Sequence, residues 1–109
     1  MKKLRKLRDD ERNLLMVLIT NEPQAHHLID SLDKAVVEEM SDGGMGSLFF
    51  HHGDNLNRHF SRQLVEKEFI DEDGVPLIVS INLDNHDELY ELDIWKVDFS
   101  PLKKIPRII

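Results

Sequence analysis

The chain has 109 residues, of which 40% are hydrophobic and 32% charged, a balance typical of a folded globular protein rather than of a disordered chain. It contains no cysteine, which excludes disulfides, a thiolate nucleophile and cysteine-ligated metal. The longest apolar run, Leu14 to Ile19, is far shorter than the roughly 20 residues that cross a bilayer. We therefore expect one cytoplasmic domain over residues 1–109, without contact to a membrane.

The net charge of −7 is unevenly distributed. Residues 1–12 hold six Lys/Arg and three Asp/Glu, and residues 103–109 hold three more Lys/Arg. Residues 13–102 therefore carry five basic and 18 acidic residues, a net charge of −13. Such a field repels nucleic acid and favours a cationic protein partner. The alternative is that the excess acid serves solubility alone.

Two helices are predicted in the first third of the chain. Asp9 or Asp10 can cap the first helix, which is expected to end near Asn21. Its apolar residues recur at helical spacing between Leu14 and Ile19. The second helix runs from about Gln24 to Leu32 and carries its apolar residues on one face. The basic N-terminus resembles the start of a signal peptide, but acidic residues 9–11 stand where the apolar stretch should begin, so export is not expected.

The pattern changes to strands after residue 34. Ala35–Met40 and Ser47–His51 flank a strong turn signal at 41–44 and predict a hairpin. After a polar loop at 52–57, strands are expected over 62–70, 76–83 and 88–99, joined by short acidic turns at 71–74 and 84–87. Such turns connect only antiparallel neighbours. The expected fold is α+β, with two N-terminal helices packed on one face of a five-stranded, mainly antiparallel sheet.

Two segments carry a resemblance to known proteins. They are Met40–Ser47, which contains SDGGMGS, and Glu91–Leu102, which reads ELDIWKVDFSPL. Through them, residues 35 to 106 resemble a family of small bacterial proteins of unknown function, and this resemblance implies no activity. The small size and acidic charge are also similar to those of immunity proteins of contact-dependent or polymorphic toxin systems, which act in the cytoplasm and cover a toxin domain.

The glycine-rich segment 42–47 differs from a phosphate-binding loop. A phosphate loop opens a helix, and its Walker form has Lys before Ser or Thr, whereas Gly46 precedes Ser47 here and a predicted strand follows. We expect a backbone role instead, in a turn with positive φ or at a close approach of two chain segments.

The histidines do not show a metal-ligand pattern. They are His26, His27, His51, His52, His59 and His86. A zinc site needs three or four converging ligands, and adjacent histidines on one strand point to opposite faces. We therefore expect exposed or hydrogen-bonded histidines, with no metal, no other cofactor and no catalytic residue.

Carboxylates are the most distinctive candidates for a binding surface. Each of two predicted strands carries an i, i+2 acidic pair, and the members of such a pair share one sheet face. If the two faces coincide, a dense acidic surface results, although a solvated face with dispersed charges is the alternative. The expected partner-binding residues are Glu66, Glu68, Asp71, Glu72, Asp73, Asp84, Asp87, Glu88, Glu91 and Asp93.

Trp95 is the only tryptophan and shares a strand face with Val97 and Phe99, which predicts core packing. The neighbouring Asp93 and Asp98 are expected to accept backbone hydrogen bonds.

Together these patterns predict a non-enzymatic acidic binding protein, specifically an immunity protein that neutralises a basic toxin domain such as a nuclease. The alternatives are a small enzyme or metal-binding protein that uses histidines and carboxylates, and a housekeeping interaction module. A neighbouring toxin gene with a variable C-terminal end would favour the immunity protein, whereas a metabolic operon would favour the alternatives.

Overall fold

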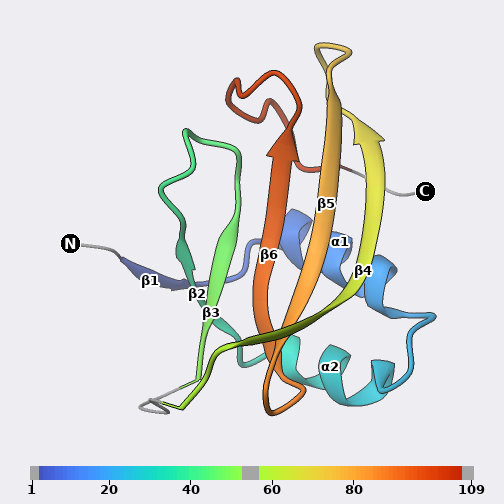
Figure 1. The fold of residues 1–109 in the computed structure, drawn as a ribbon, viewed down its shortest axis with the longest axis vertical. Helices are drawn as coiled ribbons and strands as arrows, with labels where there is room; N and C mark the ends of the chain where they lie inside the picture. The colour runs from blue at the N-terminus through green and yellow to red at the C-terminus, as the bar shows by residue number, and fades with distance from the viewer. Residues whose placement is uncertain (1–2, 53–56, 107–109) are drawn as a thin grey trace.

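Two helices and one antiparallel sheet make up the computed structural model, which describes residues 3–52 and 57–106 (Figure 1). The helices are α1 (Asp9–Ile19) and α2 (Ala25–Leu32). The strands are β1 (Leu4–Lys6), β2 (Val36–Glu39), β3 (Leu48–His51), β4 (Phe60–Ile70), β5 (Pro76–Asp84) and β6 (Leu89–Lys96). Their order in the sheet is β1-β2-β3-β6-β5-β4, and all neighbours are antiparallel.

The α+β class, the β2–β3 hairpin and the three consecutive antiparallel strands β4 to β6 confirm the predictions. The expected number of five strands is wrong, because the N-terminal segment adds β1 to the edge of β2. A strand of three residues, two of them basic, is too short to show a period of two. The last strand ends at Lys96 instead of Phe99. The predicted loop at 52–57 falls largely outside the described residues.

Side chains of the sheet alternate between a buried and a more open face. Leu77, Val79 and Ile81 of β5 are fully buried, whereas Ile78 and Ser80 point to the opposite side. We call the buried side the core face and the other side the open face. Both helices lie behind the sheet in Figure 1. One hydrophobic cluster contains core-face residues together with Leu14, Leu15, Leu18 and Ile19 of α1 and Leu28 and Leu32 of α2.

An ion pair joins β1 to the start of α1. Arg8 occupies the N-cap position, so the prediction that Asp9 or Asp10 caps the helix is wrong. The reason is the buried Glu11, whose Oε1 accepts the Arg8 backbone N–H at 2.8 Å. Both Nη atoms of Arg5 also donate to the Glu11 carboxylate, each at 2.9 Å. This bidentate contact fixes the short edge strand against the helix.

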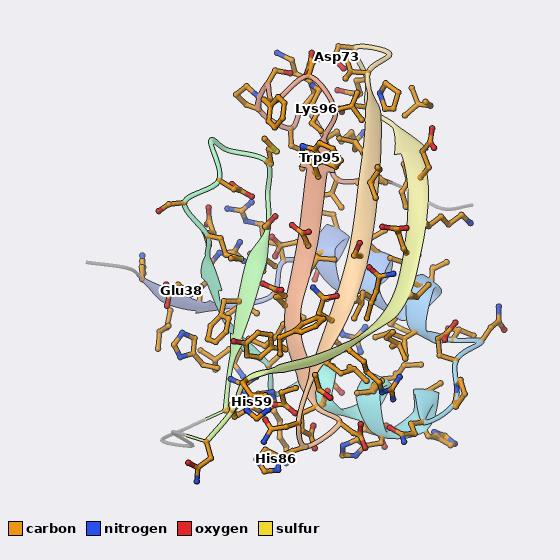
Figure 2. All side chains as sticks on the ribbon, viewed as in Figure 1. Glu38, His59, Asp73, His86, Trp95 and Lys96 are labelled. Carbon is orange, nitrogen blue, oxygen red and sulfur yellow. The ribbon has the colours of Figure 1, made fainter. Side chains whose placement is uncertain are left out.

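A buried lysine holds together the end of β6, the β4–β5 turn and the C-terminal segment 97–106. Lys96 points to the core face, and its Nζ lies 2.9 Å from Asp71 Oδ2 and 2.6 Å from Asp73 Oδ2. It also donates to the Pro101 carbonyl at 3.1 Å. Figure 2 shows Lys96 and Asp73 at the same end of the sheet, which we call the upper end. The Asp71 carboxylate additionally accepts backbone N–H groups from Glu72, Lys103 and Lys104.

The glycine-rich segment is a turn against which the C-terminal segment packs. Gly43, Gly44 and Gly46 have φ values of 75°, 82° and 94°, a region that favours glycine. The Gly44 carbonyl accepts the Leu102 N–H at 3.0 Å. A Cβ on Gly46 would lie 2.9 Å from Leu102 Cδ2, closer than side chains pack. The expected backbone role, both as a positive-φ turn and as a close approach, is confirmed.

Replacing Asp71 with Asn should destabilise the protein, because the buried ammonium would lose one of its two carboxylates. We expect the Tm at neutral pH to fall by on the order of 10 °C. Burial alone would raise the pKa of the Asp71 carboxyl, but hydrogen bonds from the Lys103 amide and Lys96 outweigh burial and lower it. The stability that Asp71 contributes is therefore fully present above the usual Asp pKa of 3.8, and it is lost as pH falls from that value through the lowered pKa of the folded state.

Thermal unfolding at neutral pH and urea unfolding at neutral and at acidic pH check this prediction. Asp71→Asn should lose less stability between the two conditions than the unsubstituted chain does. An unchanged Tm, or an unchanged pH dependence, would contradict the assigned role of Asp71.

Two glycine variants separate backbone strain from close packing. Gly43→Ala should cost about 1 kcal/mol for the positive φ alone, because its Cβ would meet nothing within 4 Å. Gly46→Ala should cost at least about 1 kcal/mol more, since its Cβ would also press on Leu102. Chemical denaturation of both variants measures the difference, and equal costs would contradict the close approach.

Candidate binding surface

The two acidic pairs predicted on separate strands lie on the same side of the sheet. Glu66 lies opposite Ser80 of β5, and Ser80 lies opposite Asp93 of β6. Glu68 and Glu91 are two residues from Glu66 and Asp93 along the same strands. Because residues two apart share a face, all four carboxylates lie on the open face.

Short polar side chains separate these carboxylates and hydrogen-bond to them. Ser80 Oγ lies 3.4 Å from Glu66 Oε1, and Asn82 Nδ2 donates to Glu91 Oε1 at 2.9 Å. Hydrogen-bond donors placed between like charges reduce their repulsion without neutralising it. The face therefore keeps its negative charge.

Asp93 differs from the other three carboxylates in its environment. Its Oδ1 lies 3.4 Å from the Ser47 hydroxyl. Partial removal from water raises the pKa of the Asp93 carboxyl; the Ser47 hydrogen bond opposes this rise, and the negative charge of Asp42 adds to it. Among the described residues, no backbone N–H donates to the Asp93 carboxylate, so the hydrogen bond expected there is not formed. The Asp98 carboxylate accepts the Ser100 N–H at 3.0 Å, as expected.

The other six predicted acids lie at the two ends of the sheet. Asp71 and Asp73 bind Lys96 at the upper end, where Glu72 is exposed. At the lower end Asp84 is buried, Asp87 is exposed and Glu88 Oε1 lies 2.7 Å from His27 Nε2. The buried carboxylates of Asp71 and Asp84 are bound within the chain, so the candidate surface rests on the four open-face acids.

An apolar patch lies beside the four acids, at the upper end of the open face. One row across the sheet consists of Ile70 on β4, Pro76 on β5 and Val97 just after β6. The next row contains Ile78 on β5 and Trp95 on β6. The Phe99 ring lies 5.9 Å from the Trp95 ring. We call these residues the upper apolar patch: Ile70, Pro76, Ile78, Trp95, Val97 and Phe99.

Several members of the upper apolar patch are strongly exposed, including Ile70 at 62%, Trp95 at 41% and Phe99 at 67%. The prediction that Trp95 packs in the core is therefore wrong. Its neighbours Ile94 and Lys96 occupy the core face, so strand alternation places Trp95 on the open face (Figure 2).

An arginine held by internal hydrogen bonds lies at the lower end of the sheet. The Arg58 guanidinium lies 5.5 Å from the Phe49 ring centroid and 5.2 Å from that of Tyr90. It also donates to Asp84 Oδ2 at 2.7 Å and to the carbonyls of Phe50 and Leu89. Burial alone would raise the pKa of the Asp84 carboxyl, but hydrogen bonds from Arg58 and from backbone amides lower it. Arg58 is thus committed to the fold.

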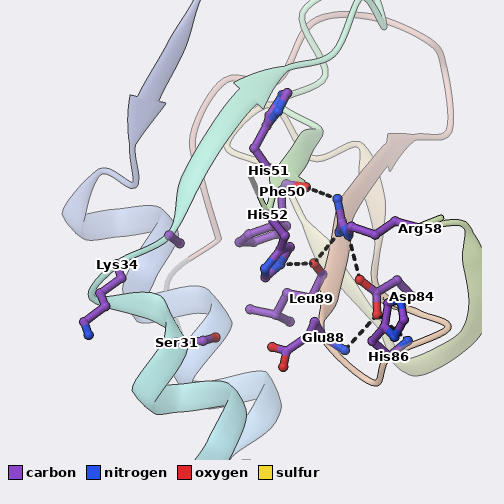
Figure 3. Close-up of a pocket in the computed structure, with 11 residues that line it drawn as sticks. Ser31, Lys34, Phe50, His51, His52, Arg58, Asp84, His86, Glu88 and Leu89 are labelled. Atoms are coloured by element: carbon purple, nitrogen blue, oxygen red, sulfur yellow. Dashed lines mark hydrogen bonds and ion pairs between the residues drawn. The ribbon is translucent and has the colours of Figure 1, made fainter. Parts of the chain in front are cut away.

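A cavity of about 430 Å³ lies beside Arg58 (Figure 3). Three of its lining residues are histidines, and two of these have partners: His52 Nε2 lies 3.0 Å from the Leu89 carbonyl, and His51 Nε2 lies 2.8 Å from Glu38 Oε1. Since a carbonyl only accepts, His52 carries its proton on Nε2 in this contact. His86 lines the same cavity and is exposed.

A metal site has no support from the side chains that the structure describes. Among them, no group of three or more His, Cys, Asp or Glu is placed to hold an ion. His26 and His59 are exposed, and His27 contacts Glu88.

A family model described as Domain of unknown function (DUF6984) matches residues 4–106. The chain belongs to this family. The match runs from β1 to the end of the C-terminal segment 97–106. It therefore includes every helix and strand described above. No curated protein and no solved structure matches the chain. Within the described residues, no helix has the length and apolar character needed to cross a membrane.

In this DUF6984 chain, sequence reasoning identified the four open-face acids but missed the upper apolar patch. The signal was present in the alternation of Trp95, Val97 and Phe99 with Ile94 and Lys96. Both sets are partly apolar, and the sequence alone does not show that Lys96 has carboxylate partners on the core side.

Alanine substitutions at adjacent positions of β6 test which side is buried. Trp95→Ala should change the free energy of unfolding by no more than about 1 kcal/mol, because the side chain is on the open face. Ile94→Ala should cost about 2 to 5 kcal/mol, because the side chain is 1% exposed and leaves a cavity. Equilibrium unfolding in urea measures both, and a larger loss for Trp95 would contradict the assignment of faces.

Proposed function

We propose that this chain is a non-enzymatic binding protein whose open sheet face takes a basic protein. The observation that supports this proposal is the adjacency of two features on strands β4 to β6. An upper apolar patch of exposed large side chains lies next to the carboxylates of Glu66, Glu68, Glu91 and Asp93. Protein interfaces commonly combine an apolar centre with a polar, charged rim.

The backbone at Phe99 supports a role for the exposed aromatic side chains. Phe99 has φ of 64°, a conformation that costs a bulky L-residue on the order of 1 kcal/mol. The Phe99 N–H donates to the Lys96 carbonyl at 2.9 Å, so the turn after the buried lysine holds this conformation. An aromatic side chain kept exposed beside Trp95 at such a cost is suited to contact a partner.

The charge of the face selects the kind of partner. Within the described residues, no ion pair neutralises any of the four open-face acids, whereas Arg58 and Lys96 are bound to carboxylates elsewhere. A basic protein would supply the missing cations and would be steered toward the face during encounter.

More specifically, we propose that the chain is an immunity protein that covers a basic nuclease toxin. A nuclease presents Lys and Arg to nucleic acid, and an acidic face can pair with the same residues and occlude them. A housekeeping module would use the same face for a different basic partner, so the gene next to this one decides between the two.

Charge reversal on and off the face tests the proposal against the toxin domain encoded by the neighbouring gene. Glu68→Lys should lower the association rate about ten-fold at low salt and weaken its salt dependence, since steering would be reduced. Trp95→Ala should mainly speed dissociation, because a contact in the apolar centre would be lost.

Glu72→Lys is the control, because it makes the same charge change at an exposed turn position away from the four open-face acids, where Glu72 Oε2 lies 4.0 Å from Lys104 Nζ. Stopped-flow association at two salt concentrations and protection of toxin-expressing cells are the measurements. Equal rates for Glu68→Lys and Glu72→Lys, with protection intact in both, would remove the open face from the proposed function.

A further inference from the structure

Strand β4 forms one edge of the sheet and extends over 11 residues from Phe60 to Ile70. Among the strands that the structure describes, it pairs with β5 alone, so half of its backbone groups point away from the sheet. Register shifts interrupt the pairing between Phe60 and Arg62 and between Gln63 and Val65. The regular part of this edge is therefore residues 65–70, at the upper end.

The hydrogen-bond pattern identifies the groups that point outward. The Asp71 N–H donates to the Val75 carbonyl at 2.9 Å, and the Pro76 carbonyl accepts from Val97 on the other side at 3.1 Å. Along an antiparallel strand, the backbone N–H and C=O groups of successive residues point alternately to the two sides. Those of Phe69 therefore point toward β5, and those of Ile70 point toward the free edge. Glu66 and Glu68 share the orientation of Ile70, and no hydrogen bond to their outward backbone groups was found among the described residues.

The same three residues carry their side chains on the open face. Glu66 and Glu68 are exposed and unpaired with any cation among the described residues, and Ile70 is 62% exposed beside the upper apolar patch. An added strand would therefore meet unpaired backbone groups, two carboxylates and an apolar contact at one place.

We propose that an extended basic segment of the partner adds to β4 as a further strand. Its backbone bonds to residues 66, 68 and 70, and its alternate Lys or Arg side chains lie opposite Glu66 and Glu68. An apolar side chain at the end of the segment contacts Ile70. This inference rests on the proposed function and specifies how the basic partner is held.

Pairing of β4 with a second copy of this chain is disfavoured by charge. Two antiparallel β4 strands joined over residues 65–70 would bring Glu66 and Glu68 of one copy against those of the other. Like charges directly opposite on a sheet are destabilising, whereas opposite charges stabilise. The charge pattern of the edge thus selects a basic segment over the chain itself.

The test uses the full chain and a synthetic peptide of about eight residues in which lysine alternates with threonine and valine replaces the lysine at one end, so that valine and the lysines share one side. The control peptide has the same sequence with N-methyl groups at alternate residues, which removes the N–H groups that would bond to β4. Amide hydrogen exchange followed by NMR should show new protection of Glu66, Glu68 and Ile70 with the first peptide. The N-methylated peptide should bind at least about five-fold more weakly.

Two variants of one residue provide a second measurement. Glu68→Gln removes the carboxylate and keeps the outward backbone N–H, whereas Glu68→Pro removes both. Proline is tolerated at this position because the N–H of an edge strand faces solvent there. After both variants are shown to melt cooperatively, Glu68→Pro should bind the peptide about five-fold more weakly than Glu68→Gln.

The outcomes separate this inference from the proposed function. Equal binding of the plain and N-methylated peptides, or no new protection at residues 66, 68 and 70, overturns strand addition. If the toxin domain then still shows the effects of Glu68→Lys and Trp95→Ala, the open face remains the binding surface. A dimer of the free chain that dissociates on substitution of Glu68 by proline would also overturn the inference.

Discussion

The burial of one charged side chain, Lys96, constrains much of this molecule. An ammonium removed from water is tolerated only when it is paired and hydrogen-bonded, and Lys96 finds these partners in Asp71, Asp73 and the Pro101 carbonyl. The contacts bring a turn and the C-terminal segment to the end of β6. Because side chains alternate along a strand, the burial of Lys96 also places Trp95 on the open face. The exposure of Trp95 and the burial of Lys96 are thus linked through the alternation of β6.

Most of the fold could be predicted because its signals are local. The apolar spacing of α1 and α2, the glycine turn and the acidic turns at 71–74 and 84–87 are each readable within a few residues. Two features depend on distant partners. β1 forms by pairing with the distant β2, where Arg5 lies opposite Val37, and Lys96 next to the exposed Trp95 has its carboxylate partner 25 residues away at Asp71. The rule that apolar residues are internal gave the wrong face for Trp95, since it ignores such pairing.

The candidate site could also be predicted only in part from the sequence. The i, i+2 spacing showed that each acidic pair shares a face, but only the registers of the β4–β5 and β5–β6 ladders decide that both faces are the same, and both ladders contain bulges. Spacing also could not separate binding acids from structural ones. Asp71 and Asp84 look like ordinary turn residues, and their roles depend on Lys96 and Arg58, which are remote in sequence from their partners.

The distribution of basic residues gives the open face its chemical character. Residues 13–102 contain five Lys/Arg, and the structure commits two of them, Arg58 and Lys96, to carboxylates that are themselves structural. Those bonds stabilise the ends of the sheet, whereas the carboxylates at its centre have no ion-pair partner among the described residues. The uncompensated acids Glu66 and Glu68 lie on β4, where the face meets the free edge of the sheet. A single basic segment at that position would neutralise the face and satisfy the edge together, so the two surfaces favour the same partner chemistry.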